Sequence, residues 1–282
     1  MPTRSTTTTT APARWWRNIR SIRRTVIAAA IALLAVSSAG AAAAAPAAAA
    51  TARPASVTTG IWSKAEQVAA ALNQGGFAAL MSVSCPSAGN CSAGGYYLDS
   101  SGNQQAFVVT ETNGTWGTAE QVLGIAVQNG GNGSTVSVSC ASAGNCSAGG
   151  LYVTNGNQQA FVVTQTNGTW GTAVEVPGTA ALNAGGMAGV QSVSCPSAGN
   201  CGAGGAYTDS SGHPQAFVVS QANGTWGTAQ EVPGTAALNV GGDAAVLSVS
   251  CASAGNCSAG GSYRAVPGSN DFQAFVVNET NR

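Results

Sequence analysis

The sequence predicts an all-β fold, a four-bladed β-propeller built from four copies of one repeat between residues 60 and 282. Three observations predict it. Cysteine pairs and tryptophans recur at a nearly constant spacing, and short alternating runs separated by turn residues fill each repeat. The first and last repeats are also cut out of phase, so that the two ends of the domain can pair and close a ring.

The period is set by the cysteines and the tryptophans. The first cysteine of each pair recurs after 55, 55 and 56 residues, and the tryptophans recur after 54, 54 and 56. These tryptophans are Trp62, Trp116, Trp170 and Trp226. A period of this size is typical of propellers, solenoids and repeat arrays.

Each repeat contains four extended segments, which the third copy illustrates. Residues 190–194 alternate apolar and polar side chains, the pattern of a half-buried strand. Residues 201–208, 214–220 and 225–232 form the other three predicted strands. The third and fourth are joined by Asn-Gly, the strongest signal for a two-residue type I′ hairpin turn.

The chain ends predict ring closure. The last copy stops after its third strand, whereas residues 60–68 match the fourth strand of the other copies. The N-terminal strand is therefore expected to pair with the C-terminal blade and to remove the exposed sheet edges. An open solenoid would instead need distinct capping repeats.

The eight cysteines form four C-x5-C pairs. They are Cys85 and Cys91, Cys140 and Cys146, Cys195 and Cys201, and Cys251 and Cys257. Each pair brackets a short turn, so a disulfide would fasten one hairpin and stabilise the fold by about 2 kcal/mol. Zinc is the alternative, but zinc sites favour shorter spacings and further ligands.

The first fifty residues have the layout of a signal peptide. A basic segment that includes Arg23–Arg24 precedes an apolar run and a set of small residues. We expect residues 1–50 to be cleaved after Sec or twin-arginine export, residues 51–59 to be a linker, and the mature protein to be extracellular or at the cell surface. The alternative is an uncleaved membrane anchor.

The distribution of charge argues against nucleic-acid binding. Beyond residue 24 the chain holds four basic and ten acidic side chains, a net charge of −6, and Lys64 is its one lysine. Nucleic-acid binding needs clustered cations and is not expected.

The sequence predicts no enzyme, metal or cofactor. His213 is the only histidine and lies in a predicted turn. The glutamates of the fourth strands occur once per repeat rather than as a facing pair, which disfavours a glycoside hydrolase. They are Glu66, Glu120, Glu175 and Glu231. Asp99 and Asp209 lie in Asp-Ser-Ser-Gly turns but lack the bidentate glutamate of a calcium loop.

The run from Ser139 to Gly150, SCASAGNCSAGG, has a counterpart in every repeat. Residues 60–282 thereby resemble secreted actinobacterial-type repeat proteins with S-C-x-S-x-x-x-C-x-A-x-G units, which implies a propeller-like fold and no defined activity. The Asn-Gly and Asp-Ser-Ser-Gly turns faintly resemble the Asp-box hairpins of sialidase propellers. Sialidase activity is not carried over, because the sequence lacks an arginine cluster.

Ligand binding is predicted on the propeller face that carries the longest loops. Asparagine amides and glycine backbone in these loops suit a neutral glycan or cell-wall polymer. The candidate residues are Asn73, Asn129, Asn183, Asn239, Asp99, Asp209 and His213. Two alternatives stay open: these motifs are turns without a ligand, or the protein is a cell-surface structural or protein-interaction scaffold.

Overall fold

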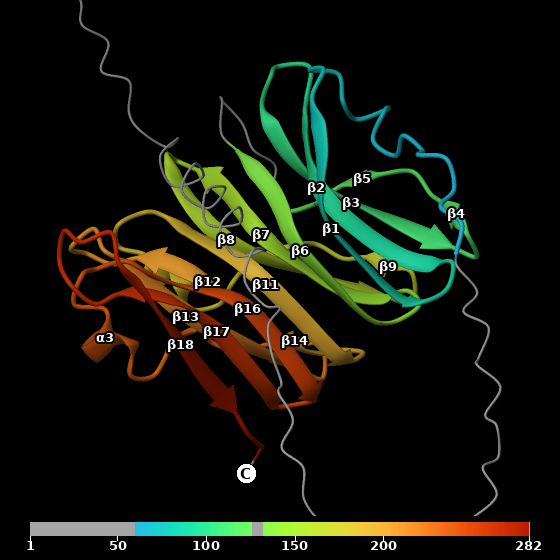
Figure 1. The fold of residues 1–282 in the computed structure, drawn as a ribbon. Coiled ribbons are helices and arrows are strands. Elements are labelled where there is room, and N and C mark those ends of the chain that lie inside the picture. Colours follow the sequence, from blue (N-terminus) through green and yellow to red (C-terminus); the bar gives the residue numbers. More distant parts are fainter. Residues whose placement is uncertain (1–59, 126–131, 282) are drawn as a thin grey trace, which may run out of the picture. The chain divides into compact units, whose positions relative to one another are not determined.

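The computed structural model describes residues 60–125 and 132–281, which contain one antiparallel sheet for each repeat (Figure 1). The predicted signal peptide, the linker and Asn129 lie outside these residues. From Ser63 onward the chain forms one compact unit. The all-β prediction is confirmed, with two one-turn helices in loops.

The four sheets follow one another along the chain. Sheet 1 contains β1 (Ala78–Ser87), β2 (Asn90–Leu98), β3 (Gln104–Thr112), β4 (Thr115–Trp116) and β5 (Glu120–Gln121). Sheet 2 contains β6 (Gly133–Ser142), β7 (Asn145–Thr154), β8 (Asn157–Thr166), β9 (Thr169–Trp170) and β10 (Val174–Glu175). Sheet 3 contains β11 (Ala188–Ser197), β12 (Asn200–Thr208), β13 (Pro214–Ala222), β14 (Thr225–Trp226) and β15 (Gln230–Glu231). Sheet 4 contains only β16 (Ala244–Ser253), β17 (Asn256–Arg264) and β18 (Phe272–Glu279). The helices α2 (Thr179–Leu182) and α3 (Thr235–Leu238) precede sheets 3 and 4.

The Asn-Gly turns form as predicted. Asn113, Asn167 and Asn223 each have φ near +50°, the left-handed conformation that a type I′ turn requires. The predicted fourth strand is less regular, because it breaks into two strands of two residues each. In sheet 3 these are β14 and β15, and Gly227 and Ala229 between them donate to Ser220 and to Pro177 of the preceding loop.

Successive sheets pack face to face. The first strands of the sheets lie side by side in the order β1, β6, β11, β16. β6, β11 and β16 each also pack on the second and third strands of the sheet before them. The core therefore lies between the sheets. Phe107, Phe161 and Phe217 of the third strands are fully buried there. These aromatic rings supply much of the apolar area that an Ala- and Gly-rich chain otherwise lacks.

The predicted ring closure is not formed. Residues 60–67 form no strand, β18 has no strand on its outer edge in the described chain, and β16 makes no extensive contact with β1. In sheet 3 the fourth segment pairs through only four residues of β14 and β15, directly after a tight turn. Residues 60–68 have no such turn to hold them beside β18, so pairing would carry the entropy cost of closing a long loop.

The four predicted disulfides are confirmed. Each links the two cysteines of one C-x5-C pair, and no described cysteine is free. The cysteines of a pair face each other across the hairpin, as Cys140 and Cys146 do between β6 and β7. Four disulfides are compatible with an extracellular protein.

Candidate functional site

The two aspartates predicted to bind ligand close their own turns. The Asp99 Oδ1 atom accepts hydrogen bonds from the backbone N–H groups of Ser101 and Asn103, both at 2.9 Å, and its Oδ2 atom accepts one from Gln105. Asp209 does the same in the third repeat, accepting from Ser211, His213 and Gln215. These carboxylates are therefore turn-forming groups.

The hydrogen bonds also shift the titration of Asp99. The amide of Gln105, followed by the backbone N–H groups of Asn103 and Ser101, lowers the pKa of Asp99 below its ordinary value. A lowered folded-state pKa stabilises the fold above the unfolded-state pKa of about 4, and this stabilisation is lost as the pH falls through the folded-state pKa.

The variant Asp99→Asn is accordingly expected to unfold at lower urea than the wild type at pH 7, because an amide cannot accept all three bonds. The difference should begin to shrink as the pH falls below about 4 and should approach zero once the pH has fallen through the lowered folded-state pKa of Asp99, where the wild-type carboxyl is protonated. Urea midpoints at several pH values measure this. Asp271→Asn is the control, because the contact of Asp271 with Ser269 uses its backbone N–H. A difference that does not change with pH would contradict the assignment.

Two of the predicted asparagines connect neighbouring sheets. Asn183, which is buried, donates from Nδ2 to the Gln158 carbonyl and to the Gln159 side chain of sheet 2. Asn239 donates in the same way to Pro214 and Gln215 of sheet 3. Both side chains hold a loop of one repeat on the third strand of the repeat before it.

Asn73 occupies the corresponding position in the first repeat, which has no preceding sheet among the described residues. Its Oδ1 atom is buried and has no hydrogen-bond partner among the described residues. His213 donates its backbone N–H to Asp209, and its ring lies against the backbone of Gly242 in the next loop. The structure thus links Asp209, His213 and Asn239 through the Gln215 side chain. It places Asn73, Asp99 and Asn183 in other turns and inter-sheet links.

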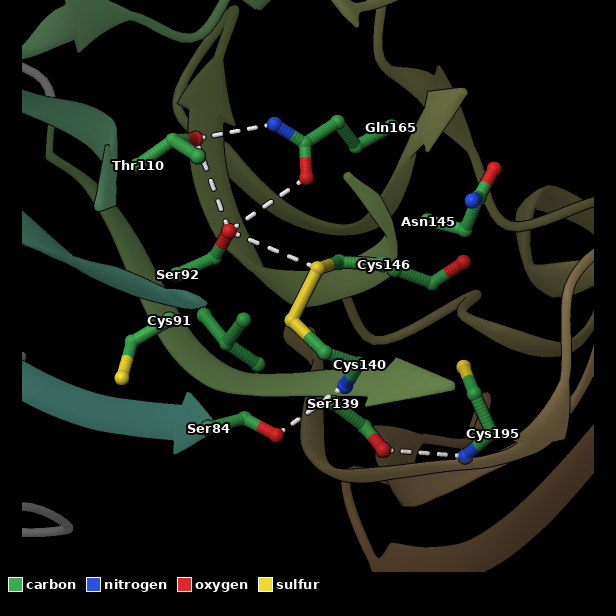
Figure 2. The surroundings of a disulfide bond; sticks show 12 residues. Ser84, Cys91, Ser92, Thr110, Ser139, Cys140, Asn145, Cys146, Gln165 and Cys195 are labelled. Atoms are coloured by element: carbon green, nitrogen blue, oxygen red, sulfur yellow. Dashed lines mark hydrogen bonds between the residues drawn. A yellow bond between two sulfur atoms is a disulfide. The ribbon is translucent and has the colours of Figure 1, made fainter. Parts of the chain in front are cut away.

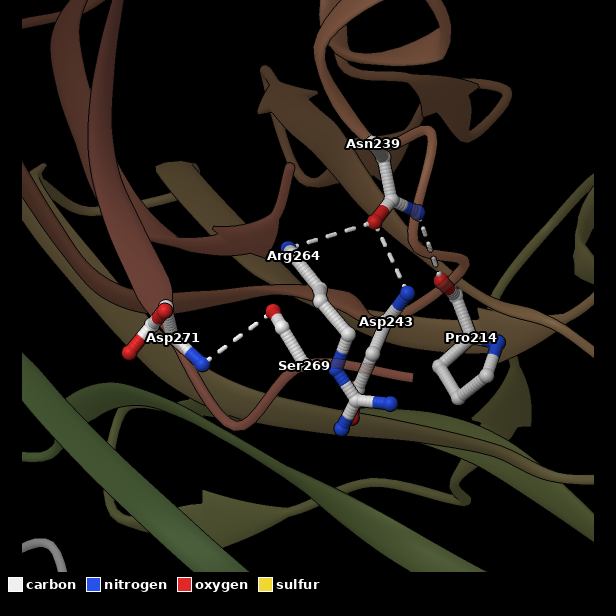
Figure 3. Close-up of polar contacts among 6 residues, drawn as sticks. All are labelled: Pro214, Asn239, Asp243, Arg264, Ser269 and Asp271. Carbon is white, nitrogen blue, oxygen red and sulfur yellow. Dashed lines mark hydrogen bonds and ion pairs between the residues drawn. The ribbon is translucent and has the colours of Figure 1, made fainter. Parts of the chain in front are cut away.

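Sequence reasoning missed a charged contact in the fourth repeat (Figure 3). Arg264 at the end of β17 forms an ion pair of 2.9 Å with Asp243 and lies 5.1 Å from the centre of the Phe272 ring. Asn239 accepts from the backbone N–H groups of both Asp243 and Arg264. Burial raises the pKa of Asp243 despite the nearby guanidinium. At the ends of β2 and β12 the equivalent residues are Leu98 and Thr208. The one charged residue at this repeated position could have revealed the contact from the sequence.

The most distinctive exposed surface lies on sheet 4. Val276 of β18 is 81% exposed, whereas its counterparts Val108 and Val162 are 1% and 0% exposed because the next sheet covers them. We call this surface the trailing face of sheet 4. It consists of Ser248, Ser250, Ser258, Gly260, Val276 and Asn278, which pair across β16, β17 and β18.

The opposite end of the array is also uncovered. In β1, Leu80 and Val83 are 50% and 60% exposed, whereas their counterparts in β11, Val190 and Val193, are buried. The four face-to-face sheets therefore leave two unlike uncovered sheet faces, one at each end, and each exposes at least one large apolar side chain.

Other kinds of site find little support in residues 60–125 and 132–281. That part of the chain contains no group of three or more His, Cys, Asp or Glu side chains that could hold a metal ion. Neither of its helices is long or apolar enough to cross a membrane. The chain matches no protein-family model, and no curated protein is significantly similar to it.

Proposed function

We propose that this protein is a non-catalytic protein-interaction module that acts outside the cytoplasm and binds its partner through the trailing face of sheet 4. The observation that carries the proposal is the exposure of Val276 at a position that the next sheet buries in sheets 1 and 2. A sheet face that exposes an apolar side chain, at a position where its counterparts are covered by a neighbouring sheet, is an uncovered packing surface that a partner protein can cover. The four disulfides support a location in an oxidising compartment.

The module consists, in this proposal, of four propeller-type blades that do not close on themselves. Support comes from the four consecutive antiparallel sheets, whose first strands lie side by side. Propeller blades pack through the same faces that sheets 1 to 3 already use. A partner on sheet 4 would occupy the place of the next blade.

Glycan binding through the loops stays a prediction and is the weaker alternative. Asp99, Asp209, Asn183 and Asn239 spend their side-chain oxygen or amide groups on bonds within the chain. A ligand would have to compete with those bonds.

The test compares two valine variants of the full chain in cells that produce it. Val276→Glu places a charge on the trailing face, whereas Val266→Glu changes a valine in the turn between β17 and β18 that is 57% exposed. Native size separation with antibody detection should show wild type and Val266→Glu in a complex larger than the chain and Val276→Glu as the free chain. A complex that Val276→Glu leaves intact, or a wild type found only as the free chain, would overturn the proposal.

A further inference from the structure

The three internal interfaces between sheets share one apolar arrangement. A glycine of the second strand receives a side chain from the first strand of the next sheet. An added Cβ at Gly149 or Gly204 would lie 2.6 Å from Val190 or Val246 of the following sheet. An added Cβ at Gly94 would lie still closer to the Thr135 side chain. In sheets 1 to 3, the face equivalent to the trailing face of sheet 4 is therefore shaped to accept the first strand of the next repeat.

A ladder of serine hydroxyls lies beside these contacts. Ser84 accepts a hydrogen bond of 3.0 Å from the Cys140 backbone, and Ser139 accepts one of 2.9 Å from Cys195 (Figure 2). The remaining bonds of the ladder run from Val138 to Ser82, from Val193 to Ser137, from Val249 to Ser192 and from Cys251 to Ser194. The hydroxyls thus accept hydrogen bonds from N–H groups along the edge of the next sheet's first strand, which no other strand of the described chain pairs with.

The two ends of the array carry the unused halves of this interface. On sheet 4, Ser248 and Ser250 accept no backbone N–H in the described chain, and a Cβ added at Gly260 would meet only atoms of β18, none within 3.4 Å. On β1, no serine in the described residues accepts from Val83 or Cys85. The side chains of Leu80 and Val83 are exposed there.

Polar side chains at the two ends also match. At the internal interfaces, Gln165 donates to Thr110, Gln221 donates to Thr164, and Glu279 accepts from Ser220. The corresponding pair at the ends is Glu111 of sheet 1 and Asn278 of sheet 4. Asn278 accepts from Ser258 through Oδ1, which leaves its Nδ2 group as the donor for a carboxylate. Glu111 supplies that carboxylate.

A third match involves the loop asparagine. Asn183 and Asn239 donate to the start of the third strand in the sheet before them. Asn73 would find the same partners, the Phe272 carbonyl and the Gln273 side chain, only on sheet 4 of a neighbour.

We propose that the partner on the trailing face of sheet 4 is the β1 strand of a second copy of this chain, so that copies join end to end through a fourth version of the internal interface. This inference rests on the proposed function and names its partner. Within one chain, sheets 2 and 3 lie between the two ends, and β16 makes no extensive contact with β1. The union is heterologous, so it gives rings where the rotation closes and filaments where it does not.

The unpaired edge of β18 fits the same arrangement. In sheet 1 the third strand pairs with β4 and β5, and residues 60–68 repeat the sequence of 114–122 at six of nine positions, including Ala-Glu-Gln-Val. In an end-to-end assembly, this segment of one copy reaches the β18 edge of the copy that it joins. The segment then supplies the fourth strand that sheet 4 lacks among the described residues.

The experiment uses the purified full chain with its disulfides intact and two variants that each block one end. Val83→Glu disables the β1 surface and Val276→Glu disables the trailing face, at positions exposed enough for both variants to fold. Mass photometry and analytical ultracentrifugation should show concentration-dependent oligomers for the wild type and monomers for each variant alone. An equimolar mixture of the two variants should form 1:1 dimers and nothing larger, because only one intact pair of ends remains.

A finer variant and a control complete the test. Gly260→Ala should fold but stay monomeric, since its methyl group occupies the place that Leu80 of the second copy needs. Val266→Glu should assemble as the wild type does. A monomeric wild type, or a mixture of the two blocked variants that stays monomeric, would overturn the inference. A monomeric purified chain that still enters a Val276-dependent complex in cells would leave the proposed function standing with a different partner.

Discussion

Gly261→Ala is expected to be among the most destabilising single substitutions in this protein, lowering the free energy of unfolding by on the order of 4 kcal/mol. An added Cβ at Gly261 would collide with the backbone carbonyl of Ala245 in β16 and would lie 3.0 Å from the Phe275 ring. The two strands approach so closely because a register irregularity between Val246 and Ser248 lies directly opposite. Main-chain atoms cannot move aside as the end of a flexible side chain can.

The adjacent residue supplies a matched control. Gly260 lies in the same strand, and an added Cβ there would find its nearest neighbour at 3.5 Å, in ordinary contact. Urea unfolding of both variants, followed by circular dichroism at a dilution that keeps the chains apart, should separate them by several kcal/mol. Equal midpoints would show that the sheet can open at Gly261 and would contradict the close approach of β16 and β17.

Reduction of all four disulfides is expected to unfold the protein at room temperature. Each closes a ring of the same short length, for which loop-closure entropy alone gives about 2 kcal/mol. Four such contributions, on the order of 8 kcal/mol, are comparable with the whole stability of a typical domain, about 5–15 kcal/mol. Circular dichroism with and without reductant, with free thiols counted by mass spectrometry, measures the effect. A fully reduced protein with an unchanged spectrum would contradict this prediction.

Two paired replacements separate the chain-entropy effect from packing. The Cys140–Cys146 and Cys85–Cys91 rings have equal sequence separation, so replacing either pair by alanine removes the same loop constraint. The Cys146 sulfur also lies 3.4 Å from the Ser92 hydroxyl of the preceding sheet. Its counterpart Cys91 has no preceding sheet among the described residues, and Cys85 is exposed on β1. Loss of the Cys140–Cys146 pair is therefore expected to cost more, by about 1 kcal/mol. Equal costs would show that the sulfur atoms add nothing to sheet packing.

The parts of the fold that local chemistry decides were predictable from the sequence. Hairpin turns at Asn113, Asn167 and Asn223 depend on two residues each, and the disulfides join cysteines six positions apart. The three long strands of each repeat follow from alternation and turn residues within one hairpin. Their predicted and observed bounds in the third repeat differ by at most three residues.

Ring closure and the candidate site depended on contacts between distant residues, and there the sequence was a poorer guide. Whether residues 60–68 reach β18 is decided by the packing of four sheets, which no single repeat encodes. The inter-sheet bonds of Asn183 and Asn239 could not be predicted, because their partners lie 24 or 25 residues earlier in the chain. The serine ladder was visible as a repeated Ser-x-Ser before each first cysteine, but alternation alone indicated only a strand.

The serine ladder gives the array a direction. Hydroxyls of one repeat always accept from the backbone of the following repeat, as Ser84 does from Cys140, and the reverse bond does not occur in the described chain. A polymer of this protein would therefore be polar in the sense of a cytoskeletal filament, with two chemically distinct tips. Elongation at one tip could be stopped by a capping molecule that leaves growth at the other unaffected.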